Sequence, residues 1–183
     1  MRIVLLDFHS YAYSIPLASA LSANCDVTLM VPDKVSAEQL QVLCPAVRLR
    51  QFRTWRRRYP QNIWMVASIL REIAAYNPDV VHQMMGCEWM DLALPLVRQR
   101  PLVTTIHDAQ IHPGDRESSS IGFNREWKCA TQIIVYAEAI KRQLMELRRV
   151  AENKIHVVPH ATYDFYLRWA NSQVVEQENT ILF

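Results

Sequence analysis

Short apolar runs separated by longer amphipathic stretches make up most of this chain. The short runs are rich in valine, isoleucine and leucine, which is typical of strands buried on both faces of a sheet. Such runs occupy residues 3–6, 26–31, 79–82, 102–106, 132–136 and 155–158. Residues 47–52 alternate apolar and polar side chains, so they predict a half-buried strand near a sheet edge.

The amphipathic stretches between these runs predict helices. Residues 63–76 carry apolar side chains three and four positions apart, at Ile63, Val66, Ala67, Leu70, Ile73 and Ala74. Further helices are expected over 88–98 and over 139–150, the latter with Ile140, Leu144 and Leu147 on one face. Two more are expected to begin at the capping residues Ser14, with Pro16 in the first turn, and Ser36.

This alternation of strands and helices predicts an α/β protein with a Rossmann-like, doubly wound parallel sheet. A chain of 183 residues that is 50% hydrophobic and 21% charged is sufficient for one sizeable domain. A net charge of +2 argues against nucleic-acid binding by the chain as a whole. The four cysteines are scattered, without metal-ligand spacing, as is typical of small core residues in a reducing compartment.

The amino end is not expected to be a signal peptide, because Asp7 and His9 interrupt its apolar run. No stretch approaches the roughly 18 apolar residues of a membrane-spanning helix. The expected location is therefore cytoplasmic, with peripheral contact at the inner face of a membrane left open.

Candidate chemistry follows the apolar run at residues 102–106, which ends in His107 and Asp108. Ligands of open parallel sheets bind beyond the carboxyl ends of the strands, so a His-Asp pair there is a candidate catalytic site. Two other interpretations stay open. The pair merely caps a strand, or it forms a metal cluster with His112 and Asp115 of the following loop.

A second candidate feature is a cluster of six arginines at positions 48, 50, 53, 56, 57 and 58, interleaved with aromatic residues. Arg53, Arg56, Arg57 and Arg58, together with Trp55, form a candidate surface for an anionic membrane. A solvated loop is the alternative, and nucleic-acid binding is only weakly supported by one local cluster.

The polar residues 171–179 are predicted to be a linker, and residues 180–183 begin another apolar strand. We therefore expect a Rossmann-like domain over 1–170, an interdomain linker, and at 180–183 the start of a carboxy-terminal domain. The chain would then be the amino-terminal half of a longer protein.

Several motifs occur in a characteristic order: N-P-D-V-V-H at 77–82, T-I-H-D at 105–108, I-I-V-Y-A at 133–137 and K-I-H-V-V-P-H at 154–160. With the polar linker and new strand that follow, this order resembles the amino-terminal domain of glycosyltransferase family 4. These are retaining enzymes of the two-domain GT-B architecture. The resemblance implies that the chain holds the acceptor, while a carboxy-terminal domain holds the nucleotide-sugar donor.

The resemblance also implies roles for particular residues. His107 would hydrogen-bond the donor sugar, with Asp108 orienting its surroundings, and the loop after the first strand would approach the donor phosphates. The family commonly has two glycines in that loop, whereas here His9 and Ser10 are the candidates to contact phosphate. The candidate acceptor- or cleft-lining side chains are Tyr11, His82, His112 and His160. A place in the core is the alternative for His82.

No G-x-G-x-x-G or P-loop motif occurs among the three glycines, which argues against a dinucleotide cofactor. We expect no cofactor and no metal, with a nucleotide-sugar as substrate. The sequence thus predicts a retaining glycosyltransferase that acts on a glycan or lipid-linked acceptor, inactive as the isolated 183 residues. The alternative is a non-catalytic module of the same fold that contacts a protein or a membrane surface.

Overall fold

A computed structural model describes residues 1–9, 11–97, 99–110, 125–162 and 167. The strands are β1 (Arg2–Asp7), β2 (Asp26–Pro32), β3 (Arg48–Phe52), β4 (Val80–Met85), β5 (Leu102–Ile106), β6 (Gln132–Val135) and β7 (Ile155–Val157). The helices are α1 (Tyr11–Leu21), α2 (Ala37–Leu40), α3 (Asn62–Tyr76), α4 (Glu88–Val97), α6 (Glu126–Cys129) and α7 (Glu138–Arg148), with a short 3₁₀ helix, η2 (Glu152–Lys154). The expected linker and second domain lie outside these residues.

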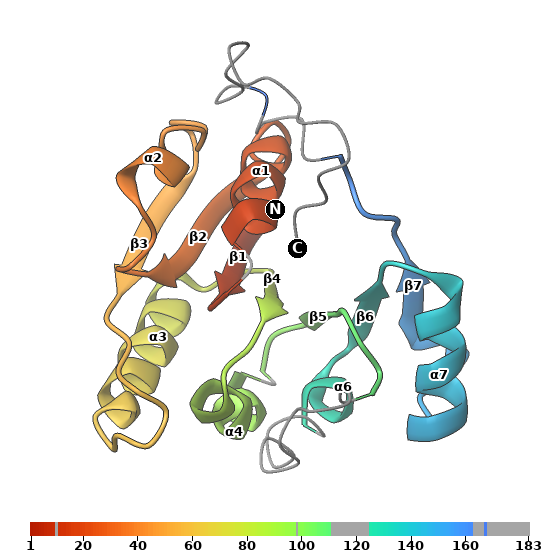
Figure 1. Cartoon of the computed structure of the whole chain (residues 1–183). Coiled ribbons are helices and arrows are strands. Elements are labelled where there is room, and N and C mark those ends of the chain that lie inside the picture. Colours follow the sequence, from red (N-terminus) through yellow and green to blue (C-terminus); the bar gives the residue numbers. More distant parts are fainter. Residues whose placement is uncertain (10, 98, 111–124, 163–166, 168–183) are drawn as a thin grey trace, which may run out of the picture.

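The seven strands form one parallel sheet in the order β3-β2-β1-β4-β5-β6-β7 (Figure 1). The chain first winds outward from β1 to β3 and then crosses back to β4, beside β1, before winding the other way. This confirms the predicted doubly wound sheet and places β3 at an edge. The reversal between β1 and β4 is the point at which ligands of such sheets bind.

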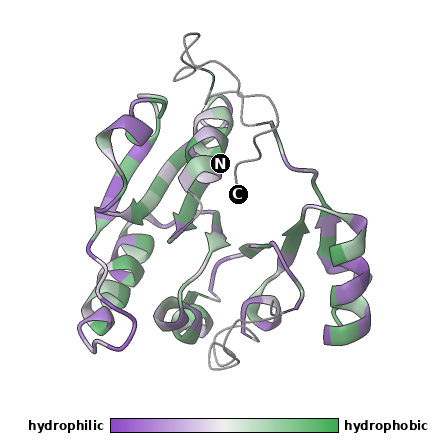
Figure 2. Ribbon diagram, viewed as in Figure 1, coloured by the Kyte–Doolittle hydropathy of each residue, from purple (hydrophilic) through white to green (hydrophobic). Residues whose placement is uncertain are grey.

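Strand β1 shows why the central strands are almost entirely apolar. Ile3 and Leu5 pack against α1 on one face of the sheet. Val4, Leu6 and the following Phe8 pack against α3 and α4 on the other face. Because successive side chains point to opposite faces, a strand covered on both sides needs apolar residues throughout. In Figure 2 the hydrophobic strand β1 contrasts in colour with helix α7, which is more hydrophilic.

Helix α1 begins earlier than the sequence predicted. It starts at Tyr11, whose hydroxyl donates a hydrogen bond to the Phe8 carbonyl oxygen. Ser14 is therefore not a cap but a buried residue inside the helix, and Pro16 lies in the middle of the helix rather than in its first turn. By contrast, Ser36 does cap α2, where it forms a reciprocal capping box with Gln39.

Helix α3 has the predicted extent, but it is rotated relative to the predicted apolar face. Ile63 is 54% exposed, and the buried side chains are Asn62, Met65, Val66, Ile69 and Ile73. Asn62 takes a buried position because its amide donates to the carbonyl oxygens of Arg56 and Tyr59. In α7 the predicted face is also partly wrong, since Leu144 is buried but Leu147 is 52% exposed.

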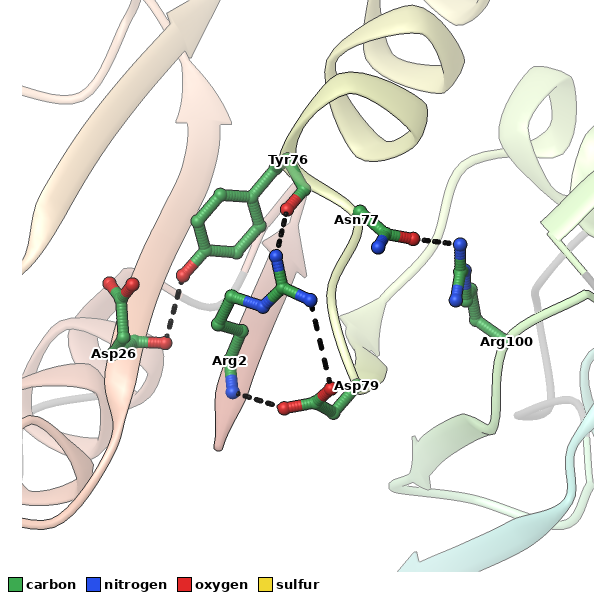
Figure 3. Close-up of polar contacts among 6 residues, drawn as sticks. All are labelled: Arg2, Asp26, Tyr76, Asn77, Asp79 and Arg100. Carbon is green, nitrogen blue, oxygen red and sulfur yellow. Dashed lines mark hydrogen bonds and ion pairs between the residues drawn. The ribbon is translucent and has the colours of Figure 1, made fainter.

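At the amino ends of the strands, polar side chains join β1, β2 and β4 (Figure 3). The Arg2 backbone N–H donates to Asp79 Oδ2 over 2.7 Å, and its guanidinium donates to the Tyr76 carbonyl oxygen. The Tyr76 hydroxyl donates to the Asp26 carbonyl oxygen, and Arg100 donates to Asn77. Asn77 ends α3 in the left-handed conformation that asparagine tolerates well.

In the part of the chain that the structure describes, no helix is both long enough and apolar enough to cross a membrane.

Candidate functional site

A cavity of about 520 Å³ opens at the carboxyl ends of the central strands. Segments that follow β1, β3, β4 and β5 line it, so it lies at the reversal point of the sheet. Its apolar walls include Phe8, Trp55, Met65, Met85 and Trp89. A volume of this size lies within the range of small-molecule binding sites.

The structure places His107 in this cavity, immediately after β5, together with Asp108. The His107 imidazole is half-buried, and its Nε2 atom is buried without a hydrogen-bond partner among the described residues. Burial lowers the pKa of His107, and the nearby His160 lowers it further, so the ring is neutral near pH 7. A neutral ring with an unused nitrogen can hydrogen-bond a ligand without adding a charge.

His107 belongs to a group of four ring side chains that also contains Tyr13, Tyr136 and His160. Its ring meets Tyr136, which follows β6, edge-on at 4.9 Å between centroids. Tyr136 packs against His160 with 4.0 Å between the ring centroids. Tyr13 of α1 contacts the rings of Tyr136 and His160. The structure thus brings His160 and His107 together, as expected for two residues at one cleft, with 6.4 Å between the ring centroids.

The loop after β1 supplies His9, whose backbone N–H donates to Asp7 Oδ1 over 2.9 Å. His9 lines the cavity beside Lys34. Burial lowers the pKa of His9, and the Lys34 charge lowers it further. The neighbouring candidate Ser10 and the loop histidine His112 lie outside the described residues.

Two candidate cleft residues do not line the cavity. His82 is 7% exposed inside β4, where its Nε2 hydrogen-bonds the Thr105 hydroxyl over 2.8 Å. Burial lowers its pKa to about 4, so it is a neutral core histidine, which was the alternative interpretation. Tyr11 packs against the apolar cluster under α1, and burial raises its pKa to about 12. Neither side chain is placed to meet a ligand in this cavity.

The sequence did not predict a cluster of polar groups in the wall of the cavity. Gln83, at 1% exposure in β4, donates through Nε2 to Asp91 Oδ1 of α4 and to Glu126 Oε1 of α6. The distances are 3.0 and 3.1 Å. Burial raises the pKa of Asp91 to about 7 and that of Glu126 to about 8, and each carboxyl also affects the other. We call Gln83, Asp91 and Glu126 the carboxyl cluster.

Gly86 packs directly over the carboxyl cluster. A Cβ atom on this residue would lie 2.2 Å from Asp91 Oδ1, 2.5 Å from Gln83 Nε2 and 2.8 Å from Glu126 Oε1. These separations are far inside van der Waals contact, so only glycine fits after β4. One sequence signal for the cluster was available: Asp91 is an acidic residue one turn before Leu94 on the buried face of α4. Helix α6 is too short to show a periodic pattern.

The arginine cluster lies beside this cavity and is less uniform than its sequence suggests. Trp55 is half-buried, lines the cavity and lies under the guanidinium of Arg53. Arg57 forms an ion pair with Glu88. Arg56, Arg57 and Arg58 line a second hollow with Trp89 and Leu92. Large apolar side chains of α3 and α4 are also exposed, with Trp64 at 73% and Leu96 at 68%.

Among the described residues, no three His, Cys, Asp or Glu side chains are grouped to hold a metal ion. His112 and Asp115, the other members of the metal cluster considered above, lie outside those residues.

Comparison with known proteins identifies the type of fold and the family of this chain. The structure resembles a UDP-GlcNAc 2-epimerase from Methanocaldococcus jannaschii, with a TM-score of 0.67 and 18% identity over 86% of this chain and 45% of that one. It also resembles a glycosyltransferase from Rickettsia africae (TM-score 0.62, 16% identity, 87% and 42% covered) and the Anabaena protein HepE bound to UDP (0.63, 13%, 88% and 44%).

These likenesses define a Rossmann-like domain of GT-B type, and the chain spans about half the length of the proteins it matches. A profile of the family named Glycosyltransferase Family 4 matches residues 13–162. The chain belongs to Glycosyltransferase Family 4, as its motif order predicted. A search of curated proteins with the sequence gave no match.

Proposed function

We propose that this chain is the acceptor-side domain of a retaining glycosyltransferase, which moves a sugar from a nucleotide-sugar to a glycan or lipid-linked acceptor. The observation that carries the proposal is the position of His107. His107 lines a cavity at the reversal point of the sheet and has a buried Nε2 without a hydrogen-bond partner among the described residues, in a chain that belongs to a glycosyltransferase family.

Two solved structures support a nucleotide-sugar donor. HepE was solved with UDP, and the UDP-GlcNAc 2-epimerase from Neisseria meningitidis was solved with UDP-GlcNAc. In this proposal the donor lies in a second domain and reaches over the carboxyl ends of β5 and β6. His107 then meets the donor sugar, while His9 approaches the diphosphate in place of the glycine amides that are absent from this loop.

The acceptor is proposed to enter the cavity from the side of Trp55 and Trp89. Aromatic rings offer flat apolar surfaces to the C–H faces of a sugar, and Asp108 lies beside His107 to accept hydrogen bonds from hydroxyl groups. The contribution of the chain to catalysis is positioning of the two substrates and a preorganised hydrogen bond at the reacting carbon.

A lipid-linked acceptor would place the mouth of the cavity at a membrane. Exposed Leu92 lines one hollow with the exposed Arg56 and Arg58, and exposed Ile63 and Trp64 follow the arginines closely in the sequence. Apolar and basic side chains together are the combination found at lipid headgroups. We propose that this face contacts an anionic membrane surface from the cytoplasm. A module with the same fold and no catalysis would use the same face and would not need His107.

The test uses the complete two-domain enzyme that the proposal requires. His107→Ala is expected to lower kcat by about 100-fold, or about 2.7 kcal/mol, if His107 stabilises the transition state. The melting temperature should hardly change, because the Nε2 atom has no partner to lose. His156→Ala is the matched control, since that histidine is exposed on β7.

Full activity of His107→Ala would contradict the proposed role, and transfer by the isolated 183 residues would contradict the two-domain proposal. If neither variant nor parent transfers sugar while both bind vesicles, the non-catalytic module is supported instead.

A further inference from the structure

The carboxyl cluster has no role in the reaction proposed above, yet it joins three elements of the cavity wall. Gln83 is the last buried polar residue of β4, Asp91 lies in the first turn of α4, and Glu126 is the first residue of α6. Both carboxyl groups line the cavity. They therefore connect the shape of the cavity to the contact between α4 and α6.

In the part of the chain that the structure describes, no positive charge balances the two carboxyl groups of the cluster. Neither Asp91 nor Glu126 meets a lysine or arginine among the described residues, and the only charge that acts on Asp91 from its own helix is the carboxylate of Glu88. Arg125, beside Glu126, donates to the Leu92 carbonyl oxygen instead. The other charged or titratable side chains along the cavity are His9, Lys34, Arg57, Cys87, His107 and Asp108.

Two carboxyl groups in such a place are stable together while the pair holds at least one proton, and between about pH 7 and about 8 it holds one. The protonated group then donates to the ionised one. The Gln83 amide then donates to both. With both groups ionised, two desolvated like charges would face each other, which is costly in a buried site.

Packing leaves the cluster no room to respond by a small shift. Gly86 lies so close to all three polar groups that even a methyl group cannot be added there. The Oε1 oxygen of the Gln83 amide is buried and has no hydrogen-bond partner among the described residues. Because the two carboxyl groups belong to α4 and α6, repulsion between them would push these two helices apart.

We propose that Asp91 and Glu126 share one proton, and that this proton holds α6 against α4 and keeps the cavity wall closed. Loss of this proton weakens the contact between α6 and α4, so the protonation state of the pair controls the shape of the cavity. The inference concerns the free protein and does not depend on which reaction the cavity serves.

The pH dependence of stability follows from the raised pKa values of the pair. The folded chain keeps a proton that the unfolded chain releases at the ordinary carboxyl pKa of about 4. The folded state binds more protons in this range, so the free energy of unfolding falls as pH rises from about 4 to the folded values of about 7 and about 8. Above about 8 the contribution becomes constant.

The first experiment needs no variant. Infrared or carbon-13 NMR titration of the isolated chain should show side-chain carboxyl groups that stay protonated at pH 6 and ionise in two steps, near about 7 and about 8. Hydrogen exchange of the amides in α6, corrected for intrinsic rates, should accelerate across the same transition. If every carboxyl is ionised by pH 6, or if α6 exchange does not change, the proposal is wrong.

The second experiment uses Glu126→Gln. The glutamine amide donates to Asp91 as the protonated acid does, but it cannot lose a proton, so this variant should keep only the ionisation step of Asp91 and should keep α6 protected at pH 9. Its melting temperature should exceed that of the parent above about pH 8.

Glu88→Gln is the matched control, since it removes a carboxylate from the same cavity and the same helix. It should keep the titration, moved to slightly lower pH because Glu88 no longer repels the ionised Asp91. If Glu126→Gln keeps the parental pH dependence, or if Glu88→Gln abolishes it, the shared proton is not at this pair. Should Glu126→Gln fail to fold, the titration of the parent chain decides alone.

Discussion

The two ends of the sheet treat polar groups in opposite ways. At the amino end, Arg2, Tyr76 and Asp79 pair with one another or with backbone atoms (Figure 3). Arg2 and Asp79 are about half exposed, so little desolvation is involved. This end is a joint between β1 and β4, and its chemistry is complete without a ligand.

At the carboxyl end, buried polar atoms lack partners and carboxyl pKa values are raised. The Gln83 Oε1 and His107 Nε2 atoms have no hydrogen-bond partner among the described residues. Two carboxyl groups share a site to which the described residues contribute no cation. Such groups lower stability, and they are retained where a ligand or a proton completes them. The polar groups at the amino ends of the strands therefore stabilise the fold, whereas those at the carboxyl ends are available for binding and chemistry.

The largest stability effect is expected from Gly86→Ala at the carboxyl end. The added methyl group would overlap three polar atoms of the carboxyl cluster, and overpacking of this kind costs about 3 kcal/mol or more. Urea unfolding should show a lower midpoint with an unchanged slope. A change of less than about 0.5 kcal/mol would mean that the cluster is looser than its distances indicate.

His82→Asn tests a buried polar group that does have a partner. The unfolded chain protonates His82 at about 6.5, while the folded chain holds it neutral down to a pKa of about 4. The unfolded state therefore binds more protons between these values, and the parent loses stability as pH falls through this range, by roughly 3 kcal/mol in total.

The asparagine variant, which has no titratable group, should lack this acid-side loss even if it is less stable at pH 7. Unfolding measured near pH 7 and near pH 4 gives the comparison. An equal acid-side loss in the variant would assign the effect to another group.

The elements that the sequence predicted well are those whose pattern is set by burial on two faces. Six of the seven strands follow from apolar runs, because a strand covered on both sides has few alternatives, and the edge strand β3 follows from its alternating pattern. His107 and Asp108 follow from their place after such a run. The buried face of α3 was not predictable from the spacing of its apolar residues. Asn62 is buried because it hydrogen-bonds the loop before the helix, and a pattern of apolar positions contains no information about that contact.

The carboxyl cluster was beyond prediction for a similar reason. Its members lie at positions 83, 91 and 126, and only the fold brings these three together. A single acidic residue on an apolar helix face, as at Asp91, indicates a buried polar contact but not its partner. Helix α6 itself has four residues, too few for periodicity to be recognised.

At the amino end, Asp79→Ala should have a moderate effect on stability and none on chemistry. It removes one hydrogen bond to the Arg2 backbone and a solvent-screened ion pair, together worth about 1 kcal/mol. The complete enzyme should keep its kcat within about twofold, because the joint lies at the far end of the strands from the cavity. A tenfold loss of kcat would show that the two ends are coupled, and the division of roles would fail.

The smallest effect on stability is expected from Arg56→Ser combined with Arg58→Ser, which tests the proposed membrane surface. Arg57 is left in place because it pairs with Glu88 and lines the cavity. Arg56 and Arg58 are exposed, so their removal should change the free energy of unfolding by less than about 0.5 kcal/mol.

Binding to vesicles that contain anionic lipid should weaken far more. Each arginine near an anionic surface contributes about 1 kcal/mol, so the double variant should bind roughly 30-fold more weakly at low salt. Raising the salt should remove most of the difference, because screening shortens the range of the charges. Arg142→Ser combined with Arg149→Ser removes the same charge from exposed positions of α7 and its carboxyl end, outside this face, and it should bind like the parent. If both double variants weaken binding equally, net charge rather than this surface attracts the membrane, and the arginine cluster is a solvated loop at the edge of the cavity.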